Sequence, residues 1–207
     1  MDRTLFLLSP AHCGGRRAQL LLSGEASFPL AVRLRQSGAP LGEVFSFLSG
    51  LYFRGKLAYA EAFQEPDLRA LVITPGRGLV LPSQWIRLED LHAIAAVGVC
   101  ADEPRFREPL ERDLATVARE LAPGDRVVLL GSIATDKYVD VLDAFVGERL
   151  HFPQEFVGRG DMSRGGLMLR CASGERELEY VAVRGAVRRG ARAPRLVRVP
   201  GGGSTRR

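Results

Sequence analysis

Lysine, cysteine, histidine and long apolar runs are all scarce in this sequence. Its three cysteines, Cys13, Cys100 and Cys171, form no Cys-x-x-Cys pair and no zinc pattern with the three histidines. We therefore predict neither a metal site nor a cofactor, and the odd number of thiols fits a reducing compartment. No apolar run approaches the roughly 18 residues of a membrane-spanning helix, and the first ten residues do not resemble a signal peptide. These absences predict a cytoplasmic protein that does not enter a membrane.

The charge is unevenly distributed along the chain. The 207 residues are 46% hydrophobic, as expected for one globular domain, and have a formal net charge of +5. From Arg184 to Arg207 there are eight arginines and no acidic residue, so residues 1–183 hold 21 basic and 24 acidic residues, a net charge of −3. The composition predicts a single domain over 1–183 and a basic flexible tail over 184–207.

Short apolar segments alternate with helical ones. Apolar runs that predict buried strands occupy 4–8, 70–74, 126–130 and 149–152. Helical spacing occupies 18–22, 28–36, 41–63 with interruptions at Gly50 and Gly55, 107–121, and 135–145 with an N-cap at Thr135. This alternation predicts an α/β domain with a central, mostly parallel sheet flanked by helices. Leu167–Cys171 and Glu177–Val183 predict a C-terminal β-hairpin.

Ligands of open α/β sheets bind beyond the carboxyl ends of the strands, so the loops after the four predicted strands are the candidate sites. After the first strand, two glycines precede Arg16 and Arg17 and a helix, a combination that can bind an anion. His12 in the same loop could transfer a proton. The alternative is a tight turn with surface arginines. The loop after the second strand presents Arg77 and fits a structural turn equally well.

The last two loops are richer in polar groups. The loop after the third strand presents hydroxyl groups, an ammonium group, a phenol and Asp136, although an acid at a helix start also simply stabilises the helix dipole. The loop after the fourth strand, 158–166, contains four glycines and two arginines. Arg159 and Arg164 could each bind a phosphate or carboxylate, with Asp161 orienting one of them. The alternative is a bulged approach to the hairpin.

One helical segment places basic groups beside aromatic rings. Arg54 and Lys56 alternate with Tyr52, Phe53 and Gly55, an arrangement that suits stacking on a base. The alternative is that the aromatic side chains of this segment belong to the core.

Five patterns occur in order along the chain. They are Leu7–Ala11, Leu51–Ala58, Ile73–Pro82, Val128–Tyr138 and Gly158–Gly166. Together they resemble bacterial YaaA-type peroxide-stress proteins, or a sister family of uncharacterised small bacterial α/β proteins. The resemblance implies a positively charged cleft, association with DNA and protection from oxidative damage. At matching positions it implies a cleft formed by Ser9, Arg54, Lys56, Ser132, Asp136, Tyr138, Ser163 and Arg164.

Three functions remain open. The first is a protein that binds nucleic acid or nucleotide phosphate in a cleft of Ser9, Arg16, Arg17, Arg54, Lys56, Arg77, Ser132, Tyr138, Arg159, Ser163 and Arg164. The second is a glycosylase-like hydrolase or transferase acting on a nucleobase or nucleotide, with His12, Asp136 and Asp161 as catalytic candidates. The third is a scaffold without a ligand. A small closed pocket containing one of these carboxylates favours the enzyme, and a broad arginine face favours DNA binding.

Overall fold

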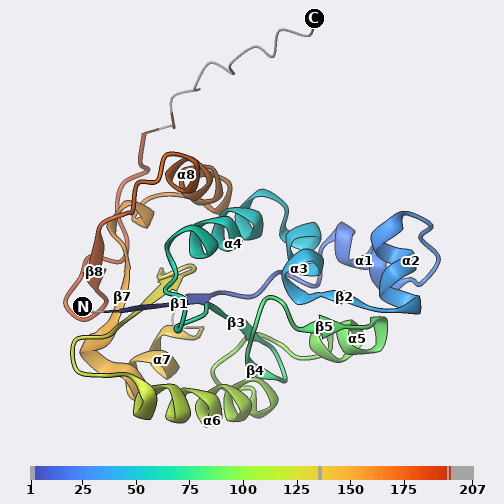
Figure 1. Ribbon diagram of the computed structural model, residues 1–207, viewed down its shortest axis with the longest axis horizontal. Helices are drawn as coiled ribbons and strands as arrows, with labels where there is room; N and C mark the ends of the chain where they lie inside the picture. The colour runs from blue at the N-terminus through green and yellow to red at the C-terminus, as the bar shows by residue number, and fades with distance from the viewer. Residues whose placement is uncertain (1–2, 135–136, 195, 197–207) are drawn as a thin grey trace, which may run out of the picture.

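The computed structural model describes residues 3–134, 137–194 and 196. Its centre is a six-stranded sheet in the order β4-β3-β1-β6-β7-β8 (Figure 1). The strands are β1 (Thr4–Leu8), β3 (Leu71–Thr74), β4 (Gly78–Val80), β6 (Arg126–Leu130), β7 (Leu150–Pro153) and β8 (Tyr180–Ala182). The four inner strands are parallel, and the edge strands β4 and β8 are antiparallel to their neighbours. The predicted α/β domain with a mostly parallel sheet is confirmed.

Helices cover both faces of this sheet, which explains why its inner strands are continuous apolar runs. The covering helices are α4 (Leu51–Phe63) and α8 (Asp161–Ser173) on one face and α6 (Pro104–Glu120) and α7 (Val139–Val146) on the other (Figure 1). Along β1, Phe6 and Leu8 belong to the first core layer, and Leu5 and Leu7 belong to the second. This is the side-chain alternation of an extended strand. Two 3₁₀ turns flank β7, η1 (Gly147–Arg149) and η2 (Gln154–Phe156).

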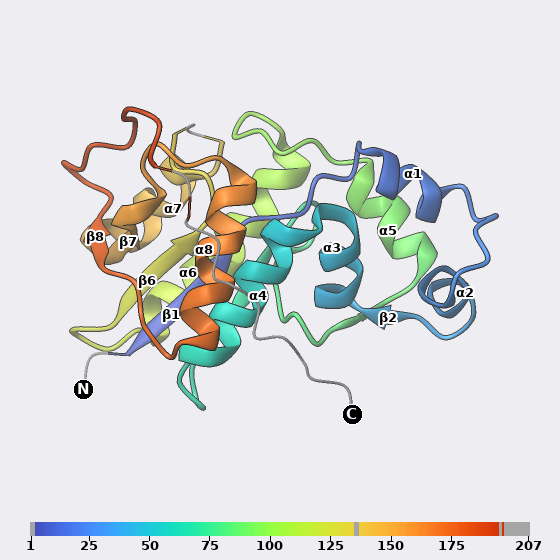
Figure 2. The same cartoon turned by 90° about the horizontal axis from the view of Figure 1, so that it is seen from above.

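A further group of helices extends the molecule to one side of the sheet (Figure 2). It consists of α1 (Arg16–Leu22), α2 (Pro29–Gln36), β2 (Ala39–Pro40), α3 (Leu41–Ser49), β5 (Trp85–Ile86) and α5 (Leu88–Ala95). Strands β2 and β5 pair antiparallel as a small second sheet. Buried side chains of this group, such as Leu34, Phe45 and Leu91, belong to the same apolar core as α4 and α8. The group is therefore packed continuously with the main body.

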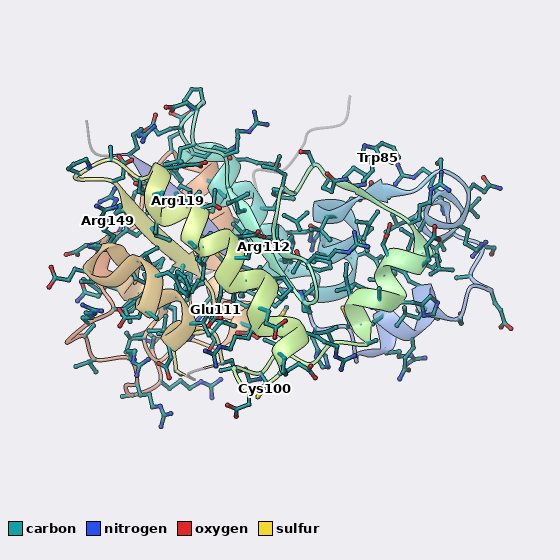
Figure 3. All side chains as sticks on the ribbon, turned by 90° about the horizontal axis from the view of Figure 1, so that it is seen from below. Trp85, Cys100, Glu111, Arg112, Arg119 and Arg149 are labelled. Carbon is teal, nitrogen blue, oxygen red and sulfur yellow. The ribbon has the colours of Figure 1, made fainter. Side chains whose placement is uncertain are left out.

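The outward face of α6 is charged. Arg112 and Arg119 are exposed on this helix (Figure 3), and Arg107 pairs with Glu111 one turn along at 2.6 Å. Such a face is typical of a helix that packs on one side and contacts solvent on the other. Over the part of the chain that the structure describes, no helix combines the length and apolar character needed to cross a membrane.

The predicted C-terminal hairpin is wrong. Leu167–Cys171 lies inside α8, and its buried members Met168 and Cys171 follow the buried Arg164 at helical spacing. Of the second predicted segment, only Tyr180–Ala182 forms a strand, and it pairs antiparallel with β7. The prediction took the short apolar run 167–171 to have the two-residue period of a strand, whereas its buried side chains follow the period of a helix.

Two helix boundaries also differ from the prediction. Gly50, with a φ of 57°, separates α3 from α4 as expected, but Gly55 lies inside α4 and does not interrupt it. Helix α7 begins at Val139 with Tyr138 at its N-cap position. The predicted N-cap, Thr135, lies outside the described residues.

The segment after β8 contacts the body. Arg184 Nε donates to the Asp143 carboxylate at 2.9 Å, and Arg189 Nε donates to a backbone carbonyl before α7 at 3.0 Å. The backbone N–H of Ala193 donates to the carbonyl of Gly158 at 3.1 Å. The first part of the predicted flexible tail is therefore held by defined contacts. The rest of it, 195 and 197–207, lies outside the described residues, and the division of the chain at residue 183 stays a prediction.

Candidate functional site

Strand β1 is the point at which the strand order reverses. Its neighbours are β3 on one side and β6 on the other, so its carboxyl end is a topological switch point, where α/β sheets bind ligands. A pocket of about 340 Å³ opens there, within the size range of small-molecule sites. Its polar lining consists of Ser9, His12, Ser49, Tyr52, Ser132, Lys137, Tyr138 and Asp161.

Behind this pocket lies Lys56, which is fully buried on α4 and has no acidic partner within ion-pair distance among the described residues. Its Nζ donates to the Ser9 carbonyl oxygen at 2.6 Å and lies 2.9 Å from Ser9 Oγ. The rings of Tyr52 and Phe53 lie 4.4 and 4.8 Å from the same nitrogen. Burial lowers the pKa of Lys56 to about 7, against a smaller raising effect of Asp161. Near neutral pH, much of Lys56 is therefore a neutral amine that can accept a proton from Ser9.

Ser9 is held at the end of β1 by contacts on both sides. Its backbone N–H donates to the carbonyl of Leu130 on β6 at 3.2 Å. The phenol oxygen of Tyr138 accepts the backbone N–H of Ser132 at 3.1 Å. Burial raises the pKa of Tyr138, while its hydrogen bonds with Ser9 and Ser132 lower it. The Ser9 hydroxyl is therefore hydrogen-bonded to Lys56 and lies close enough to the Tyr138 phenol to lower the pKa of that phenol.

Only a glycine fits beside this hydroxyl. A Cβ atom at Gly131 would lie 2.8 Å from Ser9 Cβ and 3.1 Å from the Tyr138 hydroxyl. Such distances leave no room for a side chain without moving both groups. The glycine that follows β6 is therefore a requirement of the pocket.

A second buried cation, Arg164, lies behind the pocket on α8. Its guanidinium donates to the Phe156 carbonyl at 3.1 and 3.3 Å, and its Nη1 lies 3.7 Å from the Asp161 carboxylate. The Tyr52 hydroxyl is buried, and no described residue forms a hydrogen bond with it. Burial raises the pKa of Tyr52, and Arg164 lies close enough to lower it. Asp161 and Tyr138 raise this pKa further, so the four groups form one electrostatic cluster.

Two glycines bring α4 and α8 into backbone contact and so assemble the site (Figure 2). A Cβ at Gly55 would lie 2.5 Å from the carbonyl oxygen of Gly165, and a Cβ at Gly165 would lie 2.6 Å from that of Leu51. Because no side chain separates the helices here, Lys56 of α4 and Arg164 of α8 both reach the same pocket wall. The packing of these helices therefore determines the geometry of the site.

Seven residues predicted from the sequence gather at this pocket. They are Ser9, His12, Lys56, Ser132, Tyr138, Asp161 and Arg164. His12 is exposed, and its backbone N–H donates to the Ser49 hydroxyl at 3.3 Å. Lys56 and Arg164 lie behind the lining, and no arginine is among the described residues that form the lining itself.

Four predicted phosphate ligands lie elsewhere. Arg77 pairs with Asp90 and lines a separate pocket between α5 and α6. Arg16 and Arg54 are exposed on α1 and α4. Arg17 donates to a backbone carbonyl of α3 at 3.3 Å. The loop after β3 therefore does not share the pocket at the end of β1.

Arg159 and Ser163 line a second pocket, of about 570 Å³, at the start of α8. Arg192 and Asp161 line it too, so Asp161 lies between the two pockets. Arg159 Nη1 donates to Ser163 Oγ at 3.3 Å and to a backbone carbonyl of the C-terminal segment at 3.0 Å. Its Nε is buried and has no hydrogen-bond partner among the described residues. The catalytic candidate Asp136 lies outside the described residues.

Lys56, predicted to be a ligand facing a cleft, is buried in the structure. A signal for this burial was present, because Lys56 follows Tyr52 by four residues and precedes Tyr59 and Ala60 by three and four. These are the spacings of one helix face. The unpaired state of the Tyr52 hydroxyl and the requirement for Gly131 were missed, because both depend on contacts between segments distant in sequence.

Comparisons with protein-family models, with curated proteins and with solved structures give no match to this chain. The resemblance to YaaA-type peroxide-stress proteins therefore stays a prediction. Among the residues that the structure describes, no three His, Cys, Asp or Glu side chains gather as metal ligands do. The polar groups of the pocket are therefore the evidence that bears on the function of this protein.

Proposed function

We propose that the chain is an enzyme, a hydrolase or transferase, in which Ser9 is the nucleophile and Lys56 its general base. The observation that carries this proposal is the buried Nζ of Lys56 at 2.9 Å from the Oγ of a serine that lines the pocket. Serine–lysine pairs perform the chemistry of serine–histidine pairs on several folds. Asp161 lines the same pocket and so places a carboxylate near the proposed nucleophile, as the enzyme hypothesis requires.

The reaction follows from the positions of these groups. As Ser9 Oγ attacks an electrophilic centre of the substrate, its proton moves to the neutral Nζ of Lys56. The bond to the leaving group breaks, and protonated Lys56 returns the proton to that group. Because Lys56 does not line the pocket, it acts through Ser9 and does not itself attack the substrate. Asp161 and His12 line the same pocket and can position the water that releases the product.

Labelling with an alkyl fluorophosphonate tests this proposal. Ser9 Oγ is expected to bond to phosphorus as fluoride leaves and the serine proton passes to Lys56. Mass spectrometry should locate the adduct on the tryptic peptide of residues 4–16, in which Ser9 is the only serine. Ser9→Ala should abolish labelling. Ser173→Ala, at the distant end of α8, should not change it. An adduct on another serine, or none on the folded wild type, would reject Ser9 as the nucleophile.

A second candidate function, binding of the phosphates of a nucleotide or of DNA, has support from the pocket at the start of α8. Arg159, Arg192 and Ser163 line it, and the buried Nε of Arg159 has no partner among the described residues. The positive end of the 13-residue helix α8 begins at the same place. This arrangement offers several hydrogen-bond donors to one phosphate group.

Fluorescence anisotropy with labelled single-stranded and duplex DNA tests this second function. Arg159→Ala and Arg192→Ala are each expected to weaken binding several-fold and to reduce its dependence on salt, because each removes a phosphate contact. Arg54→Ala, which removes an exposed arginine of α4 that lines neither pocket, is the matched control. Equal losses in all three variants would indicate non-specific attraction and would reject a phosphate site at α8.

A further inference from the structure

Tyr52 has a property that the proposed reaction leaves unexplained. It is 8% exposed, it lines the pocket beside Ser9, and its hydroxyl proton has no acceptor among the described residues. A buried hydroxyl without a partner costs free energy, so native proteins usually satisfy such groups with protein, water or a ligand. A ligand in this pocket would lie next to it.

The chemistry of that ligand follows from the state of the phenol. Burial raises the pKa of Tyr52, with smaller raising effects from Asp161 and Tyr138, so the hydroxyl keeps its proton at physiological pH and acts as a hydrogen-bond donor. A phenol oxygen can also accept a hydrogen bond, but Arg164 already offers donors to it. The unmet need is therefore an acceptor for the phenol proton, such as a carbonyl oxygen. Arg164 contributes positive charge from behind the pocket wall, which stabilises negative charge developing on that oxygen.

Asp161 can form a second hydrogen bond with the same ligand. Its carboxylate lines the same pocket and is held at 3.7 Å by Arg164, and a carboxylate accepts hydrogen bonds. The group that meets Asp161 is therefore a hydrogen-bond donor such as an N–H. Of the described lining side chains with formal charge, Asp161 and Lys137 have opposite signs, and the Asp161 carboxylate disfavours an anionic group placed beside it.

We propose that the substrate of this pocket is a neutral amide, in which a carbonyl oxygen meets Tyr52 and the neighbouring N–H meets Asp161. This proposal rests on the proposed function of Ser9 and Lys56 and names the substrate class of the same site. Linear carboxamides and the lactam edge of a nucleobase both present this pair of groups. Tyr52, which touches the substrate carbonyl, is then a catalytic residue.

The reaction on an amide balances with the groups present. Ser9 Oγ forms a bond to the carbonyl carbon, its proton moves to Lys56 Nζ, and the oxyanion accepts the hydrogen bond of Tyr52. The carbon–nitrogen bond then breaks as a water molecule relays the proton of Lys56 to the leaving nitrogen. A water molecule cleaves the acyl–serine ester and restores the Ser9 hydroxyl.

Calorimetric titration of the full-length Ser9→Ala variant tests the substrate class without turnover. Three probes are compared: benzamide as a linear amide, uracil as a ring lactam, and benzoate as an anion of similar shape. Benzamide or uracil is expected to bind at least tenfold more tightly than benzoate. Adding Tyr52→Phe should weaken amide binding about tenfold, because the donor to the carbonyl is lost.

Tyr59→Phe is the matched control. Tyr59 is also buried on α4, but its hydroxyl is already paired with Tyr180 at 2.6 Å and with the backbone N–H of Leu178 at 2.8 Å. Its loss should lower the melting temperature and leave amide binding unchanged. Thermal melts of each variant confirm that it is folded. Tighter binding of uracil than of benzamide would identify a ring lactam as the substrate class. Tighter binding of benzamide would identify a linear amide.

The two proposals fail separately. Benzoate binding as tightly as the amides, no binding of either amide, or equal amide binding with and without the Tyr52 hydroxyl would reject the amide site. Each of these results can occur while the fluorophosphonate still labels Ser9. Conversely, amide binding that needs Tyr52 in a protein that the fluorophosphonate does not label would reject the Ser9 chemistry alone.

Discussion

Lys56→Met is expected to slow the labelling of Ser9 by the fluorophosphonate about a thousandfold. Methionine fills a similar volume but cannot accept the serine proton. In the wild type the rate should rise with pH and reach half its maximum near pH 7, where burial places the pKa of Lys56. The variant should lack this rise. Arg54→Met removes an exposed cation from the same helix and should keep both the rate and its pH profile.

The same substitution is expected to stabilise the protein at neutral and acidic pH. The pKa of Lys56 falls from its ordinary value of 10.5 to about 7 on folding, so between these values the unfolded chain binds more protons than the folded one. The free energy of unfolding of the wild type therefore rises with pH across this interval, by an amount on the order of 4 kcal/mol. Methionine does not titrate. The advantage of the variant should therefore be largest below pH 7 and shrink toward pH 10.

Urea unfolding of wild type and variant at a series of pH values measures this difference. The comparison is best confined to pH 6–10, because above this range the tyrosines of the unfolded chain ionise while burial keeps the pKa of Tyr52 high in the folded chain. A constant stability difference across pH 6–10 would show that Lys56 is not desolvated in the folded state. Such a result would contradict the proposal that Lys56 acts as a general base.

Gly165→Ala is expected to destabilise the fold by about 3 kcal/mol and to lower its melting temperature by about 10 °C. The new Cβ would lie 2.6 Å from the carbonyl oxygen of Leu51, and because that neighbour is backbone, α4 and α8 have to move apart. The movement would also carry Arg164 and Asp161 away from Tyr52. Amide binding should therefore fall together with stability.

Gly166→Ala is the control for this prediction. A Cβ at this position would meet only the end of the Leu196 side chain, at 3.5 Å, and alanine in a helix interior is favoured over glycine by about 0.5–1 kcal/mol. Thermal melts should therefore show this variant to be as stable as the wild type or more so. If Gly165→Ala melts at the same temperature as Gly166→Ala, the close contact of the two helices does not determine the stability of the site.

The apolar runs of the chain are enough to predict the sheet and the edge at which the pocket lies. Thr4–Leu8 and Arg126–Leu130 are recognisable as inner strands because helices cover both faces of the sheet, and a strand buried on both faces has to be apolar throughout. The carboxyl ends of such strands are where loops can converge. Ser9, Ser132 and Asp161 were therefore predicted by their positions along the chain.

The contacts of these residues, in contrast, depend on how distant segments pack together. Ser9 and Lys56 are 47 residues apart in sequence, and their contact depends on how α4 packs against β1 and α8. Arg77, predicted to share the cleft, instead pairs with Asp90, a partner that no local pattern identifies. Sequence patterns report periodicity and local geometry, which are properties of short segments. Burial, pKa and hydrogen-bond partners depend on every segment that surrounds a group, and these properties are the grounds for proposing Lys56 as a base.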